Sequence, residues 1–458
     1  MHCKDKEEEM KNKMNRRSFM KKTALGASLL PFVGLAEMLE AVEMGGEYKA
    51  IVVVLLEGGA DVFNMIAPND DAYAAYAVAR GSIALPKTSL LNIGNGWGMR
   101  ENMEAMQQLY AHQKLAIVAN VGTLKEPVTV AEAEAGSEKL PFELFAHNTQ
   151  RDQWMFGDAT GNSRNGWAAR AADTLYTESN PYFNINVADV NNHLQYGGKE
   201  EALHFDDAYV SPDTMKYYGF GPKSGGGELG KVYYDLYEQQ QNSSNRVMQA
   251  LAKKRISKMN LPDDLAGVFD NVDTAIQAFD TGVHEVGKPL GAQLEVVAKI
   301  LSVSKNNGFK GKKRQIFFVN QHGWDTHDSD NEHQVGYLSQ SLGAFQYELD
   351  RMGMSDQVTT MTISDFGRSL TSNNAGTDHG WGSHAFVMGG AVRGGHIYGT
   401  MPTLSKDSTD FWSDRMVPTT AMESYLATVV KWFGASDSEL NTIFPNLHRF
   451  TRNMDFMA

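Results

Sequence analysis

The sequence holds a single cysteine, Cys3, and this scarcity excludes several classes of protein. One thiol cannot form an internal disulfide framework, bind an iron–sulfur cluster or build a zinc ribbon. Because Cys3 lies at the very start of a chain of 458 residues, a cysteine nucleophile is excluded as well. The chemistry of this protein therefore rests on histidine, carboxylate and hydroxyl groups.

Long apolar runs and positive charge are also scarce. The longest aliphatic run, residues 50–56, is far shorter than the roughly 20 residues that span a membrane, so no stable membrane anchor is expected. Lys and Arg number 42 against 55 Asp and Glu, which gives a formal net charge of −13. A chain this acidic repels phosphate backbones, and nucleic acid is therefore excluded as an expected partner.

The N-terminal 36 residues have the pattern of an export signal. Residues 15–21 read Asn-Arg-Arg-Ser-Phe-Met-Lys and precede a short, mildly apolar stretch that ends in small residues. The Arg16–Arg17 pair resembles the twin-arginine motif, which implies the twin-arginine export machinery as a partner. We expect a signal peptide over 1–36, cleavage near Ala36 and a periplasmic or otherwise exported protein. A basic, frayed N-terminal arm is the alternative interpretation.

The remainder, residues 37–458, is predicted to form a single α/β domain. Apolar strands bounded by turn residues alternate with segments of helical spacing, which favours a mostly parallel sheet. A final pair of strands is predicted to be joined by a glycine-rich turn, and residues 225–305 read as a helical insertion or layer. The predicted strands are 49–56, 115–121, 182–187, 315–319, 358–363, 384–388 and 396–398, and the clearest predicted helices are 103–112 and 333–351.

Carboxylates follow three of these predicted strands at the point where each strand ends. Asp61 follows the first strand, Asp325 follows the strand over 315–319, and Asp365 follows the strand over 358–363. Ligands of parallel sheets bind beyond the carboxyl ends of the strands, so these three side chains are expected to converge. The alternative is that an aspartate in this position caps the next helix.

Histidines gather in the same part of the sequence. Five of the 13 histidines fall within a window of 63 residues, and they are His322, His327, His333, His379 and His384. Imidazole and carboxylate without thiolate are the ligands of Zn, Mn or a mixed Mg/Ca site. The sequence therefore predicts a metal centre at the strand ends, with His333 on a solvated helix face.

A second polar cluster occupies residues 145–154. His147 in this cluster is a candidate metal ligand or general acid, and Gln150 and Arg151 are candidates to hold an anion. A polar loop packed by Trp154 explains the same segment equally well.

Six short motifs also occur in a recognisable order along the chain. Together with the export signal they resemble the bacterial domain-of-unknown-function 1501 family, over roughly residues 15–435. The motifs are Gly58-Gly59-Ala60-Asp61-Val62-Phe63-Asn64, His147…Gln150…Trp154, Gly323-Trp324-Asp325-Thr326-His327, Ser364-Asp365-Phe366-Gly367-Arg368, Thr377-Asp378-His379-Gly380 and Gly389-Gly390-Ala391-Val392-Arg393-Gly394-Gly395.

This resemblance implies a branch of the alkaline phosphatase and sulfatase superfamily, and hence an α/β/α sandwich with metals at the strand ends. It also implies one or two divalent ions, either Zn, Mn or Ca/Mg. Two departures are visible, because Phe366 stands where the superfamily commonly has His, and Asn64, near the nucleophile position, cannot form an ester. By correspondence with the superfamily the metal ligands are Asp61, Asp325, His327, Asp365 and either His379 or His384.

Two functions agree with this pattern. The first is an exported metal-dependent hydrolase of phosphate or sulfate esters, acting on a small anionic ester or glycan through metal-activated water. Arg368 would clamp the anion and His147 would protonate the leaving group, although a plain salt bridge also explains Arg368. The alternative is a non-catalytic exported protein of the same fold, which binds an anionic glycan or a protein partner.

Overall fold

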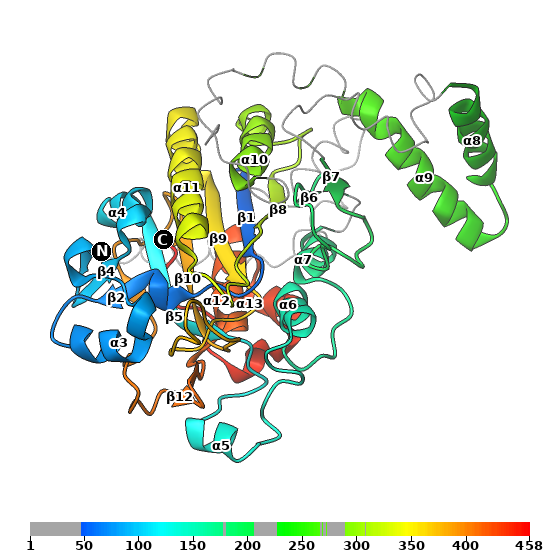
Figure 1. Ribbon diagram of the computed structural model, residues 1–458. Coiled ribbons are helices and arrows are strands. Elements are labelled where there is room, and N and C mark those ends of the chain that lie inside the picture. Colours follow the sequence, from blue (N-terminus) through cyan, green and yellow to red (C-terminus); the bar gives the residue numbers. More distant parts are fainter. Residues whose placement is uncertain are drawn as a thin grey trace, which may run out of the picture. The chain divides into compact units, whose positions relative to one another are not determined.

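The described residues contain a nine-stranded sheet, whose strands lie in the order β11-β5-β10-β9-β1-β8-β6-β7, with β14 also paired to β5 (Figure 1). This computed structural model describes residues 47–176, 180–205, 227–265, 268, 272, 289–306 and 308–458. The predicted signal peptide over 1–36 and parts of the predicted helical segment 225–305 lie outside these residues. The strands of the sheet are β1 (Lys49–Leu56), β5 (Leu115–Gly122), β6 (Asn184–Asn186), β7 (Leu203–His204), β8 (Arg314–Gln321), β9 (Val358–Ser364), β10 (Ser383–Met388), β11 (Ile397–Tyr398) and β14 (Thr420–Ala421).

The direction of the strands decides which loops meet. Every neighbouring pair is parallel except the two pairs that β10 makes with β5 and β9. Strand β1 lies between β8 and β9, and its Ala50 is in register with Gln315 on one side and Val358 on the other. The carboxyl ends of β9, β1 and β8 therefore lie side by side, next to the amino end of β10.

Helices cover both faces of the sheet (Figure 1). Alternate residues of β1, such as Val52 and Val54, pack in one apolar cluster with side chains from α4, α10 and α11. The residues between them, such as Val53, face the other side, where α12 contacts β1 and α7 packs with α13. The helices are α3 (Tyr73–Arg80), α4 (Glu104–Ala111), α5 (Val130–Glu134), α6 (His147–Phe156), α7 (Trp167–Leu175), α8 (Gly227–Gln240), α9 (Arg246–Leu265), α10 (Leu290–Ser304), α11 (Glu332–Met352), α12 (Met422–Phe433) and α13 (Asp437–Ile443).

These layers confirm the predicted fold class, an α/β protein with a mostly parallel central sheet between helices. Two small sheets accompany the main one. They are β2 (Ile66–Pro68), β4 (Trp97–Met99) and β3 (Leu91–Gly94) in that order, and β12 (Phe411–Trp412) with β13 (Arg415–Met416).

The predicted pairing of the last two strands is wrong. Both β10 and β11 exist, but β5 lies between them and pairs with each. The glycine-rich segment 389–395 bonds to the start of β5 and to the residues just before it, with the Gly395 N–H donating to the Leu115 carbonyl at 2.9 Å and the Gly394 N–H to the Gln113 carbonyl at 3.2 Å. A Cβ on Gly394 would lie 2.5 Å from the carbonyl carbon of Gln113, so only glycine allows this approach.

The helices of the region 225–305 differ in what they pack against. Helices α8 and α9 contact each other, with Tyr234 and Ile256 buried together. Helix α10 packs on the sheet, and the Gln293 side chain exchanges two hydrogen bonds, of 2.8 and 2.9 Å, with the backbone of Asn320 in β8. Within the described residues, none of the helices has both the length and the apolar character that a membrane crossing requires.

Glu423, in the first turn of α12, gives a testable pH dependence of stability. The side chain is fully buried, and burial raises the pKa of Glu423 to about 8, although Asn446 donates a hydrogen bond to it at 3.2 Å. The folded protein therefore binds a proton that the unfolded chain releases above a pKa of about 4.5. The contribution of Glu423 to the free energy of unfolding is therefore complete below about pH 4.5 and is lost as the pH rises toward 8.

We expect Glu423→Gln, which is always neutral, to raise the melting temperature at pH 8 by roughly 2 °C and to change it little at pH 5. Thermal denaturation followed by circular dichroism over this pH range measures the effect. Glu101→Gln, at an exposed position, is the control and should leave the pH dependence unchanged. An equal shift of the Glu423→Gln variant at both pH values would contradict the expectation.

Candidate metal centre

Side chains from two strand-end loops and from α6 meet at the carboxyl edge of the sheet. His147 is the first residue of α6, Asp325 and His327 follow β8, and His379 precedes β10. Ligand atoms of His147, Asp325 and His379 all lie within 4.8 Å of one another. The Nε2 atom of His327 lies 2.8 Å from His379 Nε2 and 3.1 Å from Asp325 Oδ1. Three imidazoles and one carboxylate therefore gather at one place.

Hydrogen bonds on the far side of two rings determine which nitrogen carries the proton. Nδ1 of His379 lies 2.8 Å from the Phe145 carbonyl oxygen, and Nδ1 of His147 lies 2.8 Å from Asp365 Oδ2. Both oxygens accept, so each Nδ1 donates and each neutral ring keeps its lone pair on Nε2. These two Nε2 atoms are 3.2 Å apart. At this distance the two nitrogens either share a proton or bind one cation together, and the second is the arrangement of metal-ligating histidines.

The spacing of the donor atoms fits a small divalent ion. A tetrahedral zinc site with ligand bonds of about 2.0–2.1 Å separates its ligand atoms by roughly 3.3 Å. The corresponding distances are 3.2 Å between the His147 and His379 Nε2 atoms, 3.3 Å from His379 Nε2 to Asp325 Oδ1, and 3.4 Å from His147 Nε2 to Asp325 Oδ2, so each oxygen of Asp325 faces one of the two imidazoles. Several imidazoles with one carboxylate suit zinc better than Mg or Ca, which prefer oxygen ligands.

The backbone beside the cluster has two features that the geometry requires. Phe145 has a φ of 71°, a left-handed conformation that is rare for an aromatic residue, and its carbonyl faces His379. Gly58, after β1, has a φ of 121°, and a Cβ there would lie 2.3 Å from the backbone nitrogen of Asp325. The loops after β1 and β8 can therefore pass this closely only with glycine at this position.

Asp365 lies behind His147 and is shared with an arginine. Its side chain is fully buried, and Arg151 donates to Oδ1 and Oδ2 from Nε and Nη2 at 2.8 and 2.9 Å. Burial alone would lower the pKa of Arg151, but Asp365 and Glu57, which accepts from Nη1 at 2.7 Å, raise it overall. Phe366 packs its ring against His147, with 4.7 Å between ring centroids, and offers no metal ligand.

Asp325 and Asp61 also pair with buried arginines. Arg368 donates from Nη1 to Asp325 Oδ1 at 2.9 Å, and its Nε and Nη2 bond to Thr377. Burial opposes ionisation of Asp325, yet this hydrogen bond and nearby positive charges lower its pKa overall. Arg80 forms an ion pair with Asp61 and donates to two backbone carbonyls. The Asp61 carboxylate thus belongs to a separate buried ion pair, and the Arg368 guanidinium is engaged within the protein.

His384 and Asn64 lie in the interior of the protein. The Asn120 backbone N–H donates to His384 Nδ1 at 3.1 Å, and burial lowers the pKa of His384 to about 4. Asn64 ends a short 3-10 helix and is fully buried. Of the two histidines that the sequence leaves as alternatives, His379 is the one that faces His147 and Asp325.

Arg415 is a residue at this site that the sequence analysis does not single out. It donates from Nε to the His379 carbonyl oxygen at 2.9 Å, and its guanidinium lies 4.6 Å from the centre of the Phe145 ring. No motif marks this arginine, because its contacts depend on how β13 folds back against the loop before β10. Its pairing with an aromatic residue before α6 is visible only in three dimensions.

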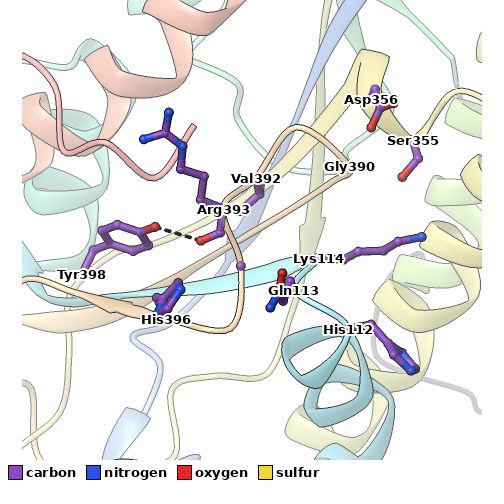
Figure 2. A pocket seen from close by; sticks show the side chains of 11 residues that line it. His112, Gln113, Lys114, Ser355, Asp356, Gly390, Val392, Arg393, His396 and Tyr398 are labelled. Atoms are coloured by element: carbon purple, nitrogen blue, oxygen red, sulfur yellow. Dashed lines mark hydrogen bonds between the residues drawn. The ribbon is translucent and has the colours of Figure 1, made fainter. Parts of the chain in front are cut away.

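The glycine-rich segment 389–395 lies at the opposite edge of the sheet, where it lines a groove of about 650 Å³ (Figure 2). His112, Lys114 and Arg393 are among the lining residues, but in Figure 2 their side chains point in different directions. Lys114 is also paired with Asp350 at 2.6 Å. The basic groups share no common point, and the glycines of this motif serve close backbone packing.

Solved structures with detectable similarity include sulfatases and alkaline phosphatases. A sulfatase from Pseudoalteromonas sp., PsFucS1, is 8% identical, with 93% of this chain and 76% of that chain covered and a TM-score of 0.39. Ps i-CgsB in complex with k-i-k-neocarrahexaose is 10% identical, with 89% and 75% covered and a TM-score of 0.36. Alkaline phosphatase from the Antarctic bacterium TAB5 is 8% identical, with 77% and 95% covered and a TM-score of 0.29. These likenesses are distant, and the chemistry of the site rests on its own residues.

A family model and the curated proteins give the remaining comparisons. No curated protein matches the sequence significantly. The family model described as "Protein of unknown function (DUF1501)" matches residues 307–427, which include Asp325, His327, Asp365 and His379. The resemblance to the DUF1501 family is therefore confirmed over this segment of the chain.

Proposed function

We propose that this protein is an exported, metal-dependent hydrolase of phosphate or sulfate esters. The observation that carries the proposal is the approach of the His147 and His379 Nε2 atoms to 3.2 Å beside Asp325. A divalent ion held by these groups would polarise an ester oxygen and lower the pKa of bound water toward neutrality. The resemblance to the alkaline phosphatase and sulfatase branch supplies the substrate class, a small anionic ester or glycan.

The residues around the cluster would then have separate tasks. His147, His379 and Asp325 bind the ion, Asp365 holds the His147 tautomer, and Arg368 holds Asp325. His327, whose side chain is 40% exposed, is the group best able to pass a proton to the leaving group.

Arg415 would orient the ester anion. It forms no salt bridge with any residue that the structure describes, and its Nε and Nη1 donate to the carbonyl oxygens of His379 and Ser413. A guanidinium in this position can donate two parallel hydrogen bonds to a phosphoryl or sulfuryl group.

The predicted export signal agrees with a substrate met outside the cytoplasm. In this proposal residues 1–36 are removed after passage through the twin-arginine export machinery, and residues 37–458 form the working domain.

A second candidate is a protein that binds an anionic glycan or a protein partner without catalysis. It is favoured by the lack of a hydroxyl group positioned as a nucleophile among the described residues next to Asp365. Ser364, beside Asp365, donates to the Leu56 carbonyl and accepts from the Ala60 N–H, so its hydroxyl is engaged. Asn64 is buried and cannot form an ester. Hydrolysis by this protein would therefore depend on water, whereas binding would need no nucleophile.

Metal analysis followed by an ester panel separates these functions. The protein is purified without chelator or His tag, its metal content is measured by mass spectrometry, and nitrophenyl phosphate and sulfate are assayed with added Zn or Mn. Bound metal with turnover supports the hydrolase. Bound metal without turnover on any ester favours the binding protein. No bound metal, with a melting temperature unchanged by added ions, overturns the metal centre itself.

A further inference from the structure

Each of the three strand-end carboxylates has an arginine partner. The pairs are Asp61 with Arg80, Asp365 with Arg151, and Asp325 with Arg368. The carboxylates nonetheless differ in access to solvent, since the side chain of Asp61 is 4% exposed, that of Asp365 is 0% exposed and that of Asp325 is 47% exposed. Two of the three are therefore neutralised inside the protein, and only Asp325 remains open.

Arg151 joins two acidic groups beside the histidine cluster. Three of its nitrogens donate to Asp365 and Glu57 at distances between 2.7 and 2.9 Å. Two imidazoles also face these carboxylates, since Asp365 Oδ2 meets His147 Nδ1 at 2.8 Å and Glu57 Oε2 lies 2.5 Å from His322 Nδ1. Three of the four oxygen atoms thus accept hydrogen bonds, and the fourth, Glu57 Oε2, is buried beside His322 without one.

A second divalent ion beside the first would need these same oxygen atoms. Asp365 stands directly behind His147, and the Arg151 guanidinium joins Asp365 to Glu57. Phe366, the next residue after Asp365, contributes an apolar ring that packs against His147 and His379. A cation brought to this place would meet the fixed positive charge of Arg151, and Phe366 would offer it no ligand.

We propose that the Arg151 guanidinium is a built-in cation that takes the place of a second metal ion, so that the centre binds one divalent ion. Arg151 is then a positioning residue, which holds Asp365 and through it the tautomer of His147. The inference rests on the proposed metal centre and adds its stoichiometry. It also explains why two acidic groups can sit so close to the histidines without a second ion to neutralise them.

Stoichiometry of the whole protein is the first test. Metal-free protein is titrated with Zn²⁺ by calorimetry, and the ratio of zinc to protein is measured after dialysis. One equivalent per chain is expected. Two equivalents would overturn this inference but leave the proposed function standing. No binding at all would overturn the proposed metal centre and this inference together.

Removal of the guanidinium is the second test. Arg151→Ala exposes Asp365 and Glu57 to each other, and we expect a second, weaker equivalent of zinc together with a larger zinc-induced rise in melting temperature. The matched control is Arg100→Ala, which breaks an equally bidentate pair with Asp330, of 2.7 and 3.0 Å, elsewhere in the fold. The control should retain one equivalent of zinc. The inference would be overturned if Arg151→Ala also bound one equivalent and its zinc-induced rise in melting temperature equalled that of the control.

Arg151→Lys keeps the test decisive if the alanine variant fails to fold. Lysine retains the positive charge but cannot bridge two carboxylates with a planar fork. We expect one equivalent of zinc, bound roughly 10-fold more weakly because Asp365 and His147 are held less firmly. Two equivalents in this variant, or an affinity equal to that of the wild type, would contradict the role given to Arg151.

Discussion

Replacement of Asp325 by asparagine is expected to abolish stoichiometric metal binding and to lower ester hydrolysis by roughly 10³-fold, because the ion contributes several kcal/mol to the reaction. Asp325 is the one strand-end carboxylate that is both open to solvent and beside the three imidazoles. Asparagine keeps an oxygen that can accept from Arg368, so the fold is expected to persist. Alanine would leave that buried guanidinium without its carboxylate partner and is expected to lower the melting temperature as well.

Metal content, hydrolysis and thermal denaturation are measured on the same preparations of the Asp325→Asn variant. Asp328→Asn is the control, since Asp328 is exposed and lies three residues further along the same loop. It should retain the metal and the activity of the wild type. Full metal occupancy in Asp325→Asn would remove Asp325 from the centre, and full activity without metal would refute a metal-dependent reaction.

The elements that could be predicted from sequence are those whose signal is local. The run Ala50–Leu56 is apolar at every position and is buried on both faces, so β1 begins and ends where its sequence indicates. The same holds for α11, which begins at Glu332 and ends one residue before Gly353. Pairing between strands has no such local signal, and for this reason the placement of β5 between β10 and β11 was not predicted.

The candidate site likewise has features that the sequence predicts and features that depend on tertiary contacts. That Asp325 and Asp365 follow parallel strands of one sheet could be deduced, because the carboxyl ends of such strands share one edge. Their different surroundings could not, since the partner of Asp365 lies 214 residues earlier in the chain, at Arg151. The orientation of His147 depends equally on tertiary contacts, because Asp365 selects its tautomer. The residue types therefore predicted a metal centre, but only the fold shows which carboxylate faces the histidines and which are paired with arginines inside the protein.

His379 and His384 give the second large prediction, because the sequence leaves them as alternatives and the structure separates them. His379→Ala removes a nitrogen beside His147 and Asp325, and we expect zinc affinity to fall at least about 100-fold. His384→Asn is expected to leave zinc affinity within a factor of two, because His384 is buried and accepts a hydrogen bond from the Asn120 backbone. Calorimetric titration of both variants with Zn²⁺ makes the comparison.

His384 also gives a prediction for acid stability. Burial lowers the pKa of His384 to about 4 from 6.5, so the unfolded chain binds a proton that the folded protein excludes. This contribution to stability is complete above about pH 6.5 and is lost as the pH falls toward 4. His384→Asn, which does not titrate, should therefore lose less stability than the wild type between these values in urea denaturation. If His384→Asn instead abolished zinc binding and His379→Ala retained it, the assignment of the ligand would have to be exchanged.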